Sequence, residues 1–214
     1  SAELEYGIKD SESKIIIADQ ERFNSINNLK KADDLKLILI RPDKSNFIND
    51  WQNYTQKYLS NEMPIINIQP EDYATILYTS GSTGYPKGVC SSHRSIISTL
   101  LQWMVVSAAR NIRDNIEPDD GVQPSCLLTV PLFHVTGSHA QFMLSFLSGR
   151  KMVLMYKWDS EIALSLIEKE KITTLNGVPT MTLEVMRNES RKKYNLSSLK
   201  AVSYTHLTLP TNTV

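Results

Sequence analysis

The residues best suited to chemistry lie in one short stretch, residues 78–88, which reads YTSGSTGYPKG. Its three glycines allow the backbone to approach a ligand closely. Backbone amides and four serine or threonine hydroxyls can donate hydrogen bonds to an anion, and a lysine adds a full positive charge. This composition favours a polyphosphate ligand. The candidate phosphate-binding residues are Thr79, Ser80, Gly81, Ser82, Thr83, Gly84 and Lys87.

This stretch differs from the two common phosphate-binding motifs. A Walker sequence counted from Gly81 would need glycine where Pro86 stands, and serine or threonine where Gly88 stands. The dinucleotide-binding pattern G-x-G-x-x-G is also absent. Strand-like residues precede and follow the stretch, so we expect it to join two strands. An ordinary hairpin turn is the alternative, but such turns are shorter and need no lysine.

Two further segments follow apolar, strand-like runs. Residues 131–137 read PLFHVTG, and residues 176–181 read NGVPTM. Ligands of open α/β sheets gather beyond the carboxyl ends of the strands, so both segments are candidate ligand contacts. His134 could instead simply end a strand, without any functional role.

Together these three segments resemble the adenylate-forming superfamily, which includes acyl- and aryl-CoA synthetases, luciferases and peptide-synthetase adenylation domains. Residues 78–89 are similar to its signature loop, residues 131–137 to its P-x-F-H-x-x-G segment, and residues 176–181 to its G-V-P-T turn. They lie in the family's order with similar gaps. The resemblance covers residues 1–202 and is greatest to fatty-acyl and medium-chain acyl-CoA synthetases. It implies an α/β fold, with a mainly parallel sheet layered with helices, as part of the ligase's large N-terminal domain.

The resemblance also implies a reaction. A carboxylate attacks the α-phosphate of ATP and expels pyrophosphate, and the thiol of coenzyme A then attacks the acyl-adenylate. Because two anions meet in the first step, positive charge and positioning matter more than a nucleophilic side chain. Lys87 would act electrostatically, and Mg²⁺ would bridge phosphate oxygens. The implied ligands are therefore ATP, Mg²⁺, coenzyme A and a small carboxylic acid.

The family pattern assigns an acyl pocket to His134, Val135, Thr136, Gly137, Gly177, Val178 and Pro179. In amino-acid-activating relatives, the position of His134 resembles an aspartate that holds the substrate ammonium. An ammonium buried without that carboxylate would be strongly unfavourable. We therefore expect an acid without an α-amino group, such as a fatty acid.

Several parts of the family pattern should lie beyond Val202. They are a Mg²⁺-binding Glu, an adenine-stacking aromatic, a ribose-binding Asp and a small domain with a catalytic Lys. We therefore expect this chain to be inactive alone, although its complete parent is active. Residues 203–214 contain no glycine and do not resemble the family. We expect that they result from a frameshift or from read-through, and the alternative is a genuinely divergent terminus. An inactive nucleotide-binding or scaffold relative, an amino-acid-adenylating enzyme and a luciferase-like enzyme remain open alternatives, and a kinase-like phosphotransferase is disfavoured.

Composition excludes other functions. The 23 basic residues equal the 23 acidic residues, so no charge excess indicates a nucleic-acid partner. Two cysteines without a C-x-x-C pattern predict a reduced, cytoplasmic setting. The histidines at 134 and 139 lack zinc-protease spacing, and we expect no protein-built metal site. No apolar run is long enough to span a membrane, and residues 96–109 would form either a buried helix or a peripheral membrane contact.

Alternating strand-like and helix-like segments must position these residues. Expected strands are 14–18, 35–40, 73–78, 88–92, 125–130, 151–155, 172–175 and 199–202. Expected helices are 46–59, 93–110, 138–147 and 160–171, and a further helix starts with residues 181–186. Asp159 and Ser160 are expected at the N-cap of helix 160–171. Strands separated by helices predict βαβ units and a parallel sheet covered on both faces.

Overall fold

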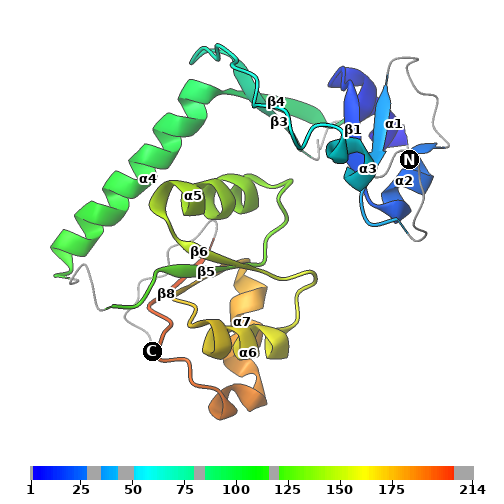
Figure 1. The fold of residues 1–214 in the computed structure, drawn as a ribbon. Coiled ribbons are helices and arrows are strands. Elements are labelled where there is room, and N and C mark those ends of the chain that lie inside the picture. Colours follow the sequence, from blue (N-terminus) through cyan, green and yellow to red (C-terminus); the bar gives the residue numbers. More distant parts are fainter. Residues whose placement is uncertain (1, 28–34, 43–50, 80–84, 116–120, 205–214) are drawn as a thin grey trace. The chain divides into compact units, whose positions relative to one another are not determined.

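The computed structural model describes residues 2–27, 35–42, 51–79, 85–115 and 121–204 (Figure 1). The chain divides into two compact units, Ser1–His93 and Arg94–Val214.

The first unit begins with a small parallel αβ layer. Its elements are α1 (Ala2–Asp10), β1 (Ile15–Ala18), α2 (Gln20–Asn27), β2 (Lys36–Leu39) and α3 (Trp51–Gln56). The isoleucine-rich β1 pairs in parallel with β2, and Phe23 and Ile26 of α2 pack against Leu37 and Leu39 of β2. The predicted helix 46–59 ends at Gln56, three residues earlier than expected. Residues 43–50, where it was expected to begin, lie outside the described residues. No side chain of α3 is buried, so tertiary packing does not extend it.

A two-stranded antiparallel hairpin follows in the same unit. It consists of β3 (Tyr73–Thr79) and β4 (Lys87–Ser92), with Tyr78 opposite Gly88 and Thr79 opposite Lys87. The prediction that the glycine-rich stretch joins two strands is therefore confirmed.

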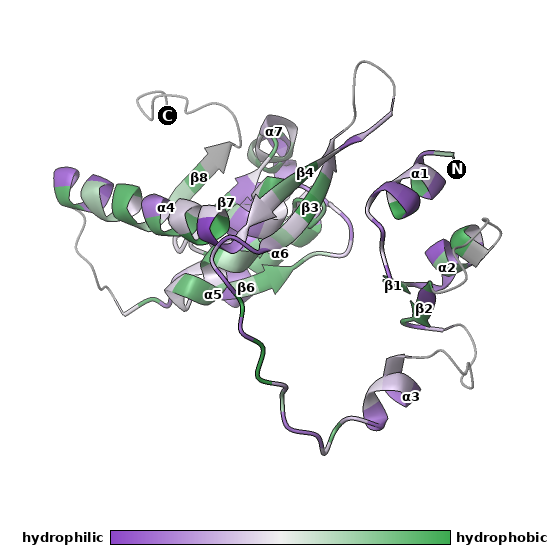
Figure 2. Cartoon of the chain, turned by 90° about the horizontal axis from the view of Figure 1, so that it is seen from above, coloured by the Kyte–Doolittle hydropathy of each residue, from purple (hydrophilic) through white to green (hydrophobic). Residues whose placement is uncertain are grey.

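The second unit contains a four-stranded parallel sheet in the order β6-β5-β7-β8 (Figure 1). The strands are β5 (Ser125–Leu128), β6 (Lys151–Leu154), β7 (Thr174–Gly177) and β8 (Ala201–Tyr204). The long helix α4 (His93–Arg113) precedes them, with hydrophobic and hydrophilic residues interspersed along it (Figure 2). Within the described residues, no helix has the length and hydropathy to cross a lipid bilayer.

Helices cover both faces of this sheet, as the sequence predicted (Figure 1). All four residues of β5 are buried, and successive side chains point to opposite faces. Leu127 packs against Leu164 and Ile167 of α6 (Ser160–Glu170), whereas Cys126 contacts Ser145 of α5 (Leu144–Ser148) at 3.5 Å. Helix α7 (Pro179–Arg187) adds Val185 to the α6 side of the core.

Several helix and strand boundaries differ from those predicted. The predicted helix 138–147 instead begins as a π-helix, η1 (Thr136–Met143), which continues into α5. Strand β5 ends before Pro131, and β7 is shifted by two residues relative to the predicted 172–175. Pro179 starts α7 two residues earlier than predicted, because proline suits the first helical position.

The predicted N-cap of α6 is confirmed, because the Asp159 side chain accepts a hydrogen bond from the Ile162 amide at 2.9 Å. A short 3₁₀ helix, η2 (Glu189–Lys193), connects α7 to the segment before β8. Strand β8 continues through Tyr204, and residues 205–214 lie outside the described residues. The predicted departure of the tail from the family therefore stays a prediction.

Candidate active site

The candidate phosphate-binding residues lie at the end of the β3–β4 hairpin. Thr79 and Lys87 occupy opposite positions in the register, and the Thr79 hydroxyl donates to the Lys87 carbonyl at 3.4 Å. Both side chains are exposed, and no described carboxylate pairs with Lys87. Ser80, Gly81, Ser82, Thr83 and Gly84 lie outside the described residues. The hairpin thus places two exposed residues, Thr79 and Lys87, opposite one another, where an anion can reach them.

Tyr78 has a defined position just before this stretch. Its ring lies over Gly88 on the opposite strand, where an added Cβ would be 3.2 Å from Tyr78 Cζ and 2.9 Å from Ile76 Cγ2. The phenol donates to Asp10 Oδ2 at 2.7 Å, and this hydrogen bond is the largest of the effects that raise the pKa of Tyr78 to about 12. The phenol is therefore protonated, and able to donate, at neutral pH. Sequence analysis missed Asp10, which lies 68 residues from Tyr78.

His134 stands in a turn between β5 and η1. Its amide donates to the Pro131 carbonyl at 3.1 Å, and its Nδ1 accepts the Thr136 amide at 3.2 Å. Because Nδ1 is an acceptor, the neutral imidazole carries its proton on Nε2. The ring is exposed, as are Phe133 and Val135 beside it. His134 therefore lies at the surface, beside two exposed apolar side chains.

Gly137 is required by close packing of backbone. A Cβ at this position would lie 2.3 Å from the Pro131 carbonyl oxygen and 2.6 Å from that of Val130. The first turn of η1 can pack so closely on the end of β5 only because this residue lacks a side chain. Gly137 therefore sets how closely η1 approaches β5, and its predicted place in the acyl pocket stays a prediction.

The turn after β7 is tied to the same region. Gly177 is followed by Val178 and then by Pro179 at the start of α7. The Asn176 carbonyl accepts hydrogen bonds from Thr129 Oγ1 and Gln141 Nε2, each at 3.0 Å. Since β5 and β7 are adjacent and parallel, the segments after them lie at one edge of the sheet.

Gln141 is a second residue that sequence analysis missed. Its side chain is fully buried in η1, and its Oε1 has no hydrogen-bond partner among the described residues. The polar residues around it in the sequence, among them Ser138 and His139, gave no signal that Gln141 would be the fully buried one. His139, by contrast, is an internal histidine: burial lowers its pKa, and its Nδ1 lies 2.9 Å from the Ser138 hydroxyl.

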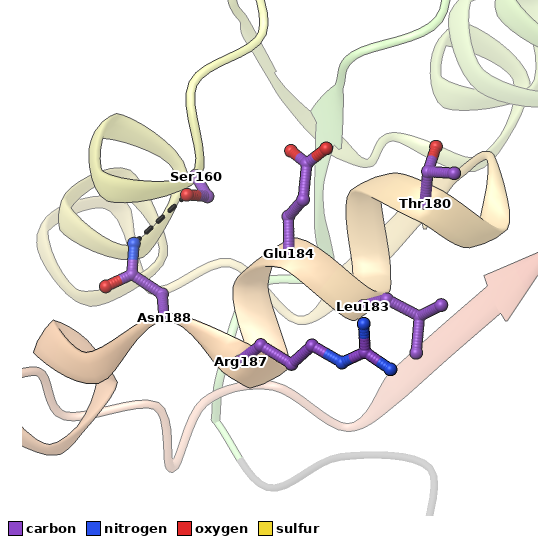
Figure 3. A pocket seen from close by; sticks show the side chains of 6 residues that line it. All are labelled: Ser160, Thr180, Leu183, Glu184, Arg187 and Asn188. Carbon is purple, nitrogen blue, oxygen red and sulfur yellow. Dashed lines mark hydrogen bonds between the residues drawn. The ribbon is translucent and has the colours of Figure 1, made fainter.

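A separate hollow of about 460 Å³ lies on the α6–α7 side of the sheet (Figure 3). Its described lining residues are Ser160, Thr180, Leu183, Glu184, Arg187 and Asn188. Asn188 donates to Ser160 at 3.0 Å, and Glu184 accepts from Trp158 at 2.5 Å. None of the predicted acyl-pocket residues lines this hollow, so we do not assign the substrate to it.

The described part of the chain contains no group of three or more His, Cys, Asp or Glu residues that could hold a metal ion. We therefore assign no Mg²⁺ ligand to it. Lys87 suits phosphate oxygens because it supplies a positive charge, whereas the Thr79 hydroxyl donates its proton to the Lys87 carbonyl.

Comparisons with known proteins agree with the three sequence segments. A sequence model of the family described as AMP-binding enzyme matches residues 1–211. The chain is 26% identical over 204 residues to 4-coumarate-CoA ligase 1 of Narcissus pseudonarcissus, covering 94% of this chain and 36% of that protein. It is 29% identical over 208 residues to acyl-CoA synthetase 7 of Caenorhabditis elegans, covering 95% and 38%.

The chain thus spans little more than a third of the length of these two relatives. Among solved structures, the N-terminal domain of FACL13 from Mycobacterium tuberculosis aligns with a TM-score of 0.74 at 20% identity, covering 98% of this chain and 48% of that one. This likeness shows the fold and confirms the predicted α/β architecture with a parallel sheet and helices. By the match of nearly its whole length, the chain belongs to the AMP-binding enzyme family.

Proposed function

We propose that the protein containing this chain activates a carboxylic acid with ATP and transfers the acyl group to coenzyme A. The observation that carries the proposal is the register of the β3–β4 hairpin, which places Lys87 opposite Thr79 at the end of the hairpin, with both side chains exposed. The CoA ligase relatives support the general reaction, while the substrate and the activity of the whole protein belong to the proposal.

In the first step, a carboxylate oxygen of the acid bonds to the α-phosphorus of ATP, and the bond to the bridging oxygen of pyrophosphate breaks. Negative charge grows on the departing pyrophosphate. Lys87 would stabilise that charge through a charge-assisted hydrogen bond, and Thr79 would add a neutral one once its hydroxyl turns from the Lys87 carbonyl to the phosphate. In the second step, the coenzyme A sulfur bonds to the acyl carbon, its thiol proton is lost, and AMP leaves.

His134 is the second residue of the proposal. Its imidazole is exposed and follows β5, at the sheet edge where the segments after β5 and β7 lie, so we assign it to the wall of the acid site. An imidazole N–H cannot neutralise a substrate ammonium, which favours acids without an α-amino group. A fatty acid is the first candidate. An aromatic acid is the second, because the relatives include proteins named 4-coumarate-CoA ligases.

The test is ATP–pyrophosphate exchange by the complete protein with a panel of fatty, aromatic and amino acids. Lys87→Ala should lower the exchange rate at least about tenfold, because loss of a charged donor typically costs about 2–4 kcal/mol at the transition state. Lys57→Ala is the matched control, since Lys57 is an exposed lysine of the same unit outside the hairpin. Unchanged exchange in Lys87→Ala would refute the assigned role, and the 214-residue chain alone should show no turnover.

A further inference from the structure

We propose that Tyr6 and Asp10 of helix α1 are positioning residues for the phosphate-binding hairpin, because they hold the two strand ends that carry Thr79 and Lys87. The contribution to ATP binding rests on the proposed function. The attachment itself is a property of the first unit and can be tested without any ligand.

The first attachment is a carboxylate that accepts two phenols. Asp10 Oδ2 accepts the Tyr78 hydroxyl at 2.7 Å, and Asp10 Oδ1 accepts the Tyr6 hydroxyl at 3.2 Å. Hydrogen bonds to an ionised oxygen are shorter and stronger than those between neutral groups. Asp10 therefore fixes the Tyr78 side chain, which immediately precedes Thr79.

The second attachment is on the other strand. The rings of Tyr6 and Tyr85 stack with centroids 4.8 Å apart and an interplanar angle of 25°. Tyr85 lies two residues before Lys87 in the sequence. Helix α1 therefore contacts the glycine-rich stretch on both sides, at Tyr78 and at Tyr85. Neither tyrosine is one of the candidate phosphate-binding residues.

Gly88 allows the first attachment. The Tyr78 ring crosses Gly88 so closely that an added Cβ would lie 3.2 Å from the ring. A side chain at position 88 would displace the Tyr78 ring and its hydroxyl. Because Gly88 has no Cβ, Tyr78 on the opposite strand can reach Asp10.

Helix α1 and the hairpin touch at a few separate contacts and do not share a continuous apolar core. A cavity of about 330 Å³ lies at the junction of α1 with the hairpin, and its lining includes Leu4 and Ile8 from the helix and Tyr78 and Pro86 from the hairpin. No residue of α1 is buried. Because little apolar packing joins the two elements, the hydrogen bond and the ring stack should carry most of the attachment.

The structural test is amide hydrogen exchange of the full chain without ligand. Asp10→Ala should speed exchange of the β3 and β4 amides near Thr79 and Lys87 about tenfold, since exchange follows local opening. Tyr78→Phe should do the same while keeping the ring over Gly88. Asp10→Asn, which retains an acceptor oxygen, should restore most of the protection. Glu5→Ala is the matched control, because Glu5 is a carboxylate of α1 that pairs with Lys9 at 2.7 Å.

Unchanged hairpin exchange in Asp10→Ala and Tyr78→Phe would overturn the proposal. Faster exchange in α1 alone would also overturn it, because it would show a role confined to the helix. Removing an acid from the C-terminal end of α1 should not weaken the helix, since the helix dipole disfavours negative charge there.

The functional test uses the complete protein. Asp10→Ala should raise the KM for ATP about tenfold and leave the KM for the acid unchanged, and Asp10→Asn should recover most of the loss. An unchanged KM for ATP would refute the positioning role. If Lys87→Ala leaves activity intact while the exchange results hold, the proposed function of Lys87 fails and the attachment of the hairpin to α1 stands.

Discussion

Replacing Gly137 with alanine is the most demanding test of the second unit. The added Cβ would lie 2.3 Å from the Pro131 carbonyl oxygen, 2.6 Å from the Val130 carbonyl oxygen and 2.8 Å from the Pro131 carbonyl carbon. All three atoms belong to the backbone, so no side-chain rotation relieves the clash. The first turn of η1 must move away from β5 by roughly 1 Å to reach ordinary contact distance.

Overpacking of this kind typically costs about 1–3 kcal/mol, and a clash with backbone belongs at the upper end. In a chain of this size, each kcal/mol lowers Tm by about 2–4 °C, so we expect a decrease of about 6–12 °C. Thermal unfolding followed by circular dichroism measures this change. The matched control is Gly7→Ala, because a Cβ at Gly7 meets no atom within 4 Å and alanine favours the helix. A Tm for Gly137→Ala within about 1 °C of the parent would refute the packing account.

Two further predictions concern the same unit. Burial lowers the pKa of His139, so the unfolded chain binds a proton more readily than the folded one near pH 6, and stability should fall as the pH is lowered from about 7 to about 5. His139→Gln should weaken that dependence when Tm is measured across the same range, and an unchanged slope would contradict it. Asp159→Ala removes the acceptor for the Ile162 amide and should lower stability by about 1 kcal/mol in denaturant unfolding, whereas Asp159→Asn should retain most of it.

Local chemistry explains what the sequence could predict. Alternating apolar segments indicated the parallel sheet with helices on both faces, and the Asp159 side chain indicated the start of α6. Strand-like residues on both sides of the glycine-rich stretch indicated that it joins two strands. Each of these predictions used patterns of residues close together in the sequence, although the sheet itself pairs strands as distant as Cys126 and Thr174.

Contacts between distant residues were beyond such reasoning. Neither the π-helical start of η1 nor the close approach of Gly137 to the Pro131 carbonyl is revealed by any periodicity. The hydrogen bond between Asp10 and Tyr78 joins residues 68 positions apart. Helix α3 was predicted too long because its aromatic residues repeat at helical intervals, although none of the α3 side chains is buried.

The Asn176 carbonyl gives the second unit its most informative connection. It receives one hydrogen bond from Thr129 at the end of β5 and another from Gln141 within η1. Gln141 is fully buried and makes this bond across the sheet edge, so the position of η1 and the position of the Gly177 turn are coupled. Because Gly137 also sets how closely η1 approaches β5, a shift there would strain the Gln141 bond and disturb the turn before α7. The glycines at 137 and 177 can therefore affect the candidate acyl site through backbone position, without touching a ligand themselves.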